Sequence, residues 1–328
     1  MKILYAIQGT GNGHVSRARD IIPILSKKGD LDILISGTQA DIVLPHTIKY
    51  KCKGMGFIFG KNGGVDLYET YKKIKFRQFH KEVKQIPIEN YDLIINDFEP
   101  VTAWGANIKK LPCIALSHQC AVLSPDAPRP KNFDILGPLI LKSYAPATAE
   151  YGFHFNKFAE NIFTPVIRSE IRQAKISNKG HYTVYLPSYD DKKIIEILQK
   201  IKNVKWEVFS KYSKCPVEYK NIIIKPIDNS AFVNSLISSE GILCGAGFES
   251  PAEALFLNKK LLVIPMKNQY EQHCNAAALK LMGVPVVKSF KKKYIEKIDN
   301  WVASTNKVTV DYKDNTEEII DMIINKHS

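Results

Sequence analysis

The chain has 328 residues, 45% of them hydrophobic, and a formal net charge of +13, so it can bury an ample core and its length suggests two domains. No apolar run reaches the roughly 18 residues of a membrane-spanning helix, and the start of the chain has no small-residue cleavage site, so we expect neither a membrane span nor a signal peptide. Six cysteines without a Cys-x-x-Cys pair favour reduced thiols in the cytoplasm over zinc or disulfides.

The first predicted element is a strand, Ile3–Ile7, followed by a glycine turn that ends at His14 and by apolar residues at helical spacing. A dinucleotide fingerprint needs its third glycine where His14 stands, and an acidic residue at the end of the second strand. The second strand, Leu31–Ile35, runs into Ser36 instead. We therefore reject a nicotinamide dehydrogenase.

His14 is expected just past the end of the first strand. At that place a neutral imidazole can accept a proton from an acceptor hydroxyl near physiological pH. The alternative is a histidine that only caps the following helix, and spacing alone slightly favours this alternative. A second motif further along the chain turns the balance toward a catalytic base.

The positive charge is densest between Lys49 and Lys84, where ten Lys and Arg residues face three Asp and Glu and are interleaved with aromatic residues. Such a segment favours contact with an anionic membrane surface or with a phosphate on an acceptor. A solvated helix after a glycine loop is the alternative. No nucleic-acid-binding module is recognisable, so we expect no nucleic-acid partner.

A buried strand, Leu93–Ile95, is followed by two acids, Asp97 and Glu99. Parallel strands share one C-terminal edge, so these acids are expected on the same edge of the sheet as His14. Either acid is then available to orient His14. The alternative for Asp97 is a residue at the N-terminus of a helix.

The strand Cys113–Leu116 ends in the same way, with His118 and Gln119. These side chains are also expected at the edge that carries His14. The alternative for His118 is an ordinary loop histidine.

We place the domain boundary near residue 165, which gives domains 1–165 and 166–313, with a C-terminal helix in 314–328 that packs back across the junction. The expected strands of the second domain are Tyr182–Leu186, Val204–Phe209 and Ile222–Ile224. Ser188 lies in the turn after the first of them, and Ile227 follows the last.

The stretch from Gly241 to Leu279 predicts strand, glycine turn, helix, strand and polar loop. The turn 245–247 precedes Ser250 as the expected N-cap, with Glu253 three residues later. Free N–H groups and the helix dipole at such a turn favour a phosphate. The alternative is that Glu253 only completes a capping box and that the loop acids and amides are solvated.

The stretch from Gly241 to Leu279 and the glycine turn that ends at His14 resemble the MurG-like group of GT-B glycosyltransferases. The resemblance covers Gly245-Ala246-Gly247, then Ser250 to Leu255, Pro265, and Glu271-Gln272 before Asn275-Ala276; the turn Gly-Thr-Gly-Asn-Gly-His with Arg17 adds an independent match. It implies an α/β fold of GT-B type, with two doubly wound Rossmann-like domains facing each other across a cleft.

The resemblance also implies roles for individual residues. His14 would be the catalytic base, supported by Asp97 or Glu99, and Glu253 would hold the ribose. The residues implied on the diphosphate and elsewhere on the donor are Gly245, Gly247, Phe248, Glu249, Ser250, Arg168, Ser188 and Ile227, with Glu271, Gln272 and Asn275 at the sugar. The residues implied on the acceptor side are Gly11, Asn12, Gly13, Arg17, His118 and Gln119.

Together these features predict an inverting glycosyltransferase that moves a hexose or N-acetylhexosamine from a nucleoside diphosphate sugar, with UDP as the expected nucleotide, to an acceptor hydroxyl. We expect no metal and no cofactor, because the helix dipole and backbone N–H groups would replace a cation. A lipid-linked acceptor at the inner face of the membrane is one expectation. The alternatives are a nucleotide-sugar epimerase of the same fold and a non-catalytic sugar-nucleotide-binding subunit.

Overall fold

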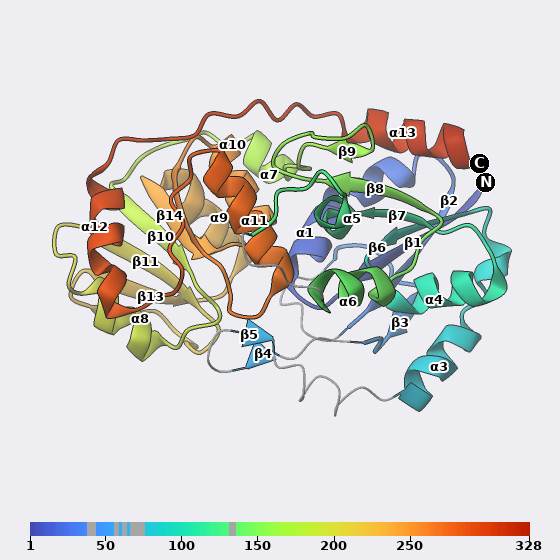
Figure 1. The fold of residues 1–328 in the computed structure, drawn as a ribbon, viewed down its shortest axis with the longest axis horizontal. Coiled ribbons are helices and arrows are strands. Elements are labelled where there is room, and N and C mark those ends of the chain that lie inside the picture. The colour runs from blue at the N-terminus through green and yellow to red at the C-terminus, as the bar shows by residue number, and fades with distance from the viewer. Residues whose placement is uncertain (38–43, 56–58, 61–63, 66–75, 131–135) are drawn as a thin grey trace.

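The computed structural model describes residues 1–37, 44–55, 59–60, 64–65, 76–130 and 136–328, and it consists of two α/β domains side by side (Figure 1). The first is built on a sheet of seven parallel strands in the order β3-β2-β1-β6-β7-β8-β9. The strands are β1 (Lys2–Gln8), β2 (Asp30–Ser36), β3 (Tyr50–Cys52), β6 (Leu93–Asp97), β7 (Ile114–Ser117), β8 (Ala149–Phe153) and β9 (Ile162–Phe163). A two-stranded ribbon, β4 (Phe59–Gly60) with β5 (Gly64–Val65), lies outside this sheet.

Helices cover this sheet and bury its strands, which explains why β1 and β6 are continuous apolar runs instead of alternating patterns. The helices are α1 (Asn12–Leu25), α3 (Phe76–Gln85), α4 (Pro100–Lys109), α5 (His118–Leu123) and α6 (Leu136–Tyr144), with a short 3₁₀ turn η1 (Ile88–Asn90). Val15, Ala18 and Ile21 on α1 are fully buried against the sheet, as their helical spacing predicts.

The second domain has six strands in the order β12-β13-β11-β10-β14-β15. They are β10 (His181–Tyr185), β11 (Lys205–Ser210), β12 (Val217–Tyr219), β13 (Ile222–Pro226), β14 (Gly241–Gly245) and β15 (Lys260–Ile264). Only β12 is antiparallel among these described strands, and its side chains are exposed, which fits an edge strand that the sequence did not predict.

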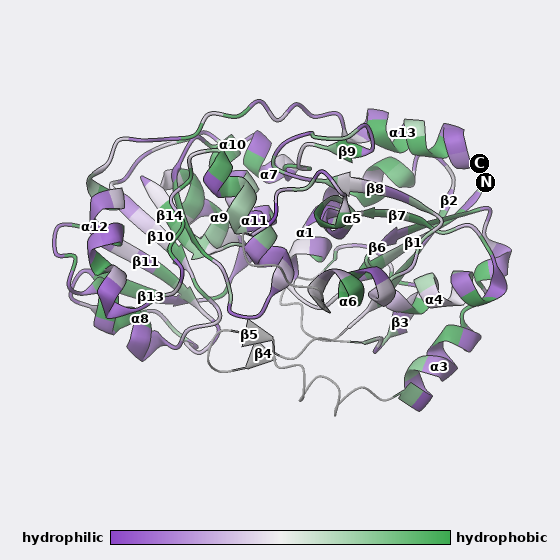
Figure 2. Ribbon diagram, in the orientation of Figure 1, coloured by the Kyte–Doolittle hydropathy of each residue, from purple (hydrophilic) through white to green (hydrophobic). Residues whose placement is uncertain are grey.

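The helices of this domain are α7 (Ser169–Arg172), α8 (Asp191–Leu198), α9 (Asn229–Ser238), α10 (Glu249–Phe256), α11 (Tyr270–Leu281) and α12 (Ile295–Ala303), with a 3₁₀ turn η2 (Lys292–Tyr294). Figure 2 shows apolar residues along the strands of both sheets, while α3 and α12 alternate between hydrophilic and hydrophobic residues. Such alternation is typical of helices with one face buried. No helix in the described ranges combines the length and apolarity that crossing a bilayer requires.

The predicted domain boundary near residue 165 lies between β9 and β10. The last helix, α13 (Thr316–His327), returns to the first domain and lies beside α1 (Figure 1). Lys28 on the first domain bonds to Asp321 at 2.7 Å and to Glu317 at 3.1 Å on this helix. One hydrophobic core cluster contains buried residues of both domains, and Val166 and Phe248 are among its members near the junction.

Each sheet reverses its strand order at one place, and these two places determine where a ligand can bind. In the first domain the reversal lies between β1 and β6, where Ile7 pairs with Asp97. In the second it lies between β10 and β14, where Tyr185 pairs with Cys244. The loops after strands diverge at such a switch point and leave a crevice. Both glycine turns of the sequence follow a switch-point strand.

Candidate functional site

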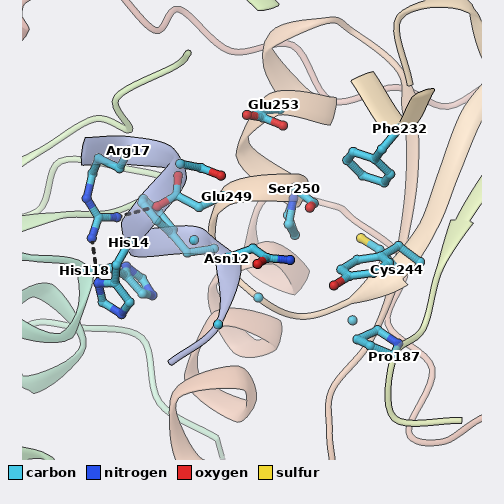
Figure 3. Close-up of a pocket in the computed structure, with 18 of the residues that line it drawn as sticks. Asn12, His14, Arg17, His118, Pro187, Phe232, Cys244, Glu249, Ser250 and Glu253 are labelled. Atoms are coloured by element: carbon cyan, nitrogen blue, oxygen red, sulfur yellow. Dashed lines mark hydrogen bonds and ion pairs between the residues drawn. The ribbon is translucent and has the colours of Figure 1, made fainter. Parts of the chain in front are cut away.

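A cavity of about 580 Å³ lies where these two switch points face each other. The first domain contributes the turn 10–13, the start of α1 and the start of α5. The second contributes the turn after β14, the first turns of α10, and residues before and on α11. Figure 3 shows side chains of both domains converging on this space. The cavity is therefore an interdomain site.

His14 is paired with Asp97 at the edge of this cavity. His14 lies inside α1, whose N-cap is Gly11, so it does not cap the helix. Its Nδ1 is 2.7 Å from Asp97 Oδ1. A carboxylate only accepts hydrogen bonds, so Nδ1 carries a proton, and in the neutral ring Nε2 then holds the lone pair. Nε2 lies 3.4 Å from the Gln119 amide nitrogen, on the cavity side.

Arg17 holds the other side of the Asp97 carboxylate. One of its nitrogens, Nη2, donates to both oxygens of Asp97 at 2.6 and 2.8 Å. Burial alone would raise the pKa of Asp97, but the charge of Arg17 and the interaction with His14 outweigh burial and hold its pKa below the ordinary value. Asp97 thus remains ionised and keeps the His14 ring in one orientation and one tautomer.

Glu99, the other acid predicted beside His14, instead caps α4, so its predicted catalytic position is wrong. Its carboxylate accepts from the backbone N–H groups of Val101 and Thr102, each at 2.7 Å. The reason is Phe98, whose φ of 56° ends β6 and turns the chain into the helix. Burial raises the pKa of Glu99 above its ordinary value, although the hydrogen bonds from Thr102 oppose this effect.

Glu253 is buried in the cavity wall and is paired with Arg168 across 85 residues of sequence. Arg168 donates to both carboxylate oxygens, from Nε to Oε1 and from Nη2 to Oε2, the latter at 2.8 Å. Arg168 also donates to Glu170 and Asn229, each at 2.8 Å. Two residues predicted for the donor therefore contact each other directly.

The helix that carries Glu253 starts two residues earlier than its sequence predicts. α10 begins at Glu249, and its N-cap is Phe248, which makes no side-chain capping bond. Ser250 is inside the helix, so Glu253 does not complete a capping box. The capping alternative is wrong, because the Glu253 carboxylate bonds to Arg168 instead.

Several side-chain contacts cross the interdomain junction near the cavity. Gln119 on α5 donates to Glu271 on α11 at 3.0 Å, and Arg17 is paired with Glu249. His118 stacks on Phe248 with ring centroids 3.9 Å apart, and its Nε2 lies 2.8 Å from Asn275 Oδ1. His118 is thus a buried interdomain residue, not a loop histidine.

Most of the residues predicted for the site line the cavity. Besides His14, these are Gly11, Asn12, Gly13, Arg17, His118, Gln119, Arg168, Ser188, Ile227, Gly245, Gly247, Phe248, Glu249, Ser250, Glu253, Glu271 and Gln272. Asp97 lies behind His14. Asn275 is fully buried below the surface of the cavity, where its amide donates to the carbonyl of Ala246 at 3.1 Å.

The sequence did not predict an aromatic wall in the second domain. Tyr185, Phe209 and Phe232 line the cavity, and the ring of Phe232 lies 5.6 Å from that of Tyr185 and 5.4 Å from that of Phe209. Tyr185 and Phe209 lie at the C-terminal ends of their strands. Their position at the ends of buried apolar runs could have predicted that they line the site, because the C-terminal ends of the strands form the ligand-binding edge of a parallel sheet.

Comparison with known proteins agrees with this architecture. The profile of the family described as "Glycosyl transferase family 1" matches residues 1–304. A search of curated protein sequences finds no match.

Solved structures match the fold over nearly the whole chain. MurG from Acinetobacter baumannii superposes with a TM-score of 0.56 at 14% identity, covering 99% of each chain. UGT89C1 from Arabidopsis thaliana, solved in complex with UDP, gives 0.58 at 12% identity, covering 99% of this chain and 94% of the other. A UDP-N-acetylglucosamine 2-epimerase gives 0.56 at 12% identity, covering 99% and 96%. The fold is therefore GT-B, and by its family profile the chain belongs to glycosyl transferase family 1.

Proposed function

We propose that this glycosyltransferase moves a hexose or N-acetylhexosamine from a nucleoside diphosphate sugar, preferably a UDP sugar, to an acceptor hydroxyl with inversion at the anomeric carbon. The observation that carries the proposal is the His14–Asp97 pair: Nδ1 is engaged by an ionised carboxylate, and Nε2 keeps a lone pair on the cavity side. A neutral imidazole held in this way is a suitable general base.

In the proposed reaction, His14 Nε2 accepts the proton of the acceptor hydroxyl while its oxygen attacks the anomeric carbon. The bond from this carbon to the diphosphate oxygen breaks, and the diphosphate leaves with the electron pair. Asp97 stabilises the imidazolium that forms, and the first turn of α10 offers N–H groups to the leaving diphosphate. A single displacement inverts the anomeric centre.

We assign each part of the donor to residues that line the cavity. Glu253 binds the ribose, and Arg168 with the turn before α10 binds the diphosphate. Glu271 and Gln272 hold the sugar, and Ile227 contacts the base through its backbone. Support comes from their position, since all of them line one cavity.

We also propose that transfer needs no metal ion, because the N–H groups and dipole at the start of α10 stabilise the leaving diphosphate. Treating the enzyme with EDTA should leave its turnover unchanged, and a loss that added Mg²⁺ restores would contradict this.

The basic segment Lys49–Lys84 is proposed to contact an anionic membrane that presents a lipid-linked acceptor. Much of this segment lies outside the described residues, but α3 is described. Val83 packs into the core, whereas Phe76 is 55% exposed and Arg77 and Lys81 are exposed beside it. A helix with one buried face and an exposed cationic and aromatic face suits the surface of a bilayer.

A screen with nucleoside diphosphates and their sugars tests the proposed function. We expect UDP and one or a few UDP sugars to bind. With an acceptor present, we expect a product whose anomeric configuration is inverted relative to that of the donor sugar, as measured by NMR. Formation of an epimeric sugar nucleotide without an acceptor would instead indicate an epimerase. Tight binding with no turnover under any condition would indicate a binding subunit.

A further inference from the structure

Glu249 lies where the donor diphosphate is proposed to bind. It is the first residue of α10, and its side chain extends to the turn of the first domain, where its Cγ would be 3.2 Å from a Cβ added to Gly13. Its carboxylate pairs with Arg17. One negative charge of the protein, carried by the first residue of α10, is therefore already paired with the buried guanidinium of Arg17 (Figure 3).

The charges of the cavity wall leave no positive excess for a diphosphate. Among the described lining residues the cations are Arg17, Arg19 and Arg168, and the acids are Asp228, Glu249, Glu253 and Glu271. Arg17 and Arg168 each hold buried carboxylates, and Arg19 lies 3.9 Å from Glu170. A diphosphate would therefore add negative charge to a site whose cations are already neutralised, which costs free energy at low dielectric.

We propose that Glu249 is an internal competitor of the donor diphosphate: its carboxylate pairs with Arg17, and the nucleotide binds as Glu249 takes up a proton. The proposal rests on the proposed function, because it takes the diphosphate to lie at the first turn of α10. Once protonated, Glu249 frees Nη1 of Arg17 for the diphosphate, while Nη2 stays on Asp97, and the Glu249 carboxyl can itself donate a hydrogen bond to a phosphate oxygen.

The surroundings of Glu249 favour this proton uptake. Burial is the main cause that raises its pKa to about 7; Arg17 opposes the rise, whereas Glu253 and Asp97 add to it. Glu253 lies one helical turn further on the same face of α10. The charged and titratable groups that interact with Glu249 lie on β1, α1, β6 and α10 and in the segment before α7. They are Tyr5, His14, Arg17, Asp97, Glu253 and Arg168.

The test compares UDP binding to the wild type and to Glu249→Gln at the same pH, so that the ionisation of UDP cancels. If the bound form carries the proton, the variant should bind UDP roughly 30-fold more tightly than the wild type at pH 8.5 and equally well at pH 6. Glu318→Gln is the matched control, since it removes one exposed acid of α13 and should change neither value.

A second measurement uses the unmodified protein. Calorimetry of UDP binding at pH 8 in Tris and in HEPES gives the number of protons taken up, and we expect about 0.9 more per nucleotide for the wild type than for Glu249→Gln. Equal or weaker binding by the variant at pH 8.5, or equal uptake by both, would overturn the proposal while leaving the transferase assignment intact. If neither UDP nor pyrophosphate binds to either protein at either pH, both the proposal and the donor assignment fail.

Discussion

Replacing Glu253 with alanine separates the contributions of this carboxylate to the fold and to nucleotide binding. Its side chain is 3% exposed and accepts two hydrogen bonds from Arg168. A carboxylate offers about four lone-pair positions, so about two are left for ribose hydroxyls. The structure thus lets one side chain fulfil both roles, and the variant should lose both.

The loss of stability follows from the charge that remains. Removing one partner of a buried ion pair costs about 3–5 kcal/mol, because the other charge stays buried. Arg168 keeps Glu170 and Asn229, each at 2.8 Å, so the lower end of this range is appropriate. At about 2–4 °C per kcal/mol, a loss of about 3 kcal/mol lowers the melting temperature by about 6–12 °C.

The loss of affinity has a separate cause. Charge-assisted hydrogen bonds to ribose contribute about 1.5–3 kcal/mol, so the Kd for UDP should rise roughly 10- to 150-fold. The wild type should also prefer UDP to 2′-deoxy-UDP, because an unpaired buried carboxylate is costly, and Glu253→Ala should lose this preference.

Calorimetric melting and titration with UDP at 20 °C measure the two effects independently. The double variant Arg168→Met/Glu253→Ala is the control, because it removes the stranded guanidinium and should recover part of the lost stability. Unchanged melting of Glu253→Ala would refute the energetic argument for the ion pair. Unchanged UDP affinity would refute the ribose assignment, whatever happens to the melting temperature.

Four further outcomes are expected. His14→Ala should lower turnover by roughly 100-fold or more with donor affinity nearly intact, since a general base acts in the transition state; equal losses of both would make it a binding residue. Glu99→Ala should lower stability by about 1–2 kcal/mol, the cost of a lost helix cap, with kcat nearly unchanged; a large drop in kcat would restore its catalytic role. His154 is buried, neither ring nitrogen has a hydrogen-bond partner among the described residues, and burial lowers its pKa to about 3, below the unfolded value. The unfolded chain therefore binds the proton first, so stability is lost as pH falls below about 6.5, and His154→Phe should gain about 2 kcal/mol relative to the wild type between pH 7 and pH 5 in urea melts; parallel pH profiles would contradict this. Reversing the charges of Arg77 and Lys81 should weaken co-sedimentation with anionic liposomes by at least about 30-fold, and added salt should weaken it too; no binding at low salt would remove the membrane proposal.

The sequence by itself was sufficient to predict the fold and both glycine turns. Apolar runs of strand length followed by helical spacing are local signals, and they recur in both halves of the chain. The predicted strands Leu93–Ile95 and Ile222–Ile224 lie in β6 and β13. Because parallel strands share one ligand edge, each glycine turn could be placed at the ligand edge of its own sheet. The resemblance to GT-B glycosyltransferases then predicted that the two edges, with His14 and Glu253, line the same cleft.

Only the tertiary structure decided which side chains are partners. Asp97 and Glu99 are two residues apart in the sequence, yet one faces His14 and the other caps α4, because the positive φ of Phe98 turns the chain between them. Arg168 and Glu253 look independent in the sequence, and Glu249 shows no sign of its bond to Arg17. The pair Arg17–Glu249 forms across the junction between the domains, and the pair Arg168–Glu253 joins residues 85 positions apart within the second domain. Both depend on how the elements pack in three dimensions, and local periodicity carries no information about that arrangement.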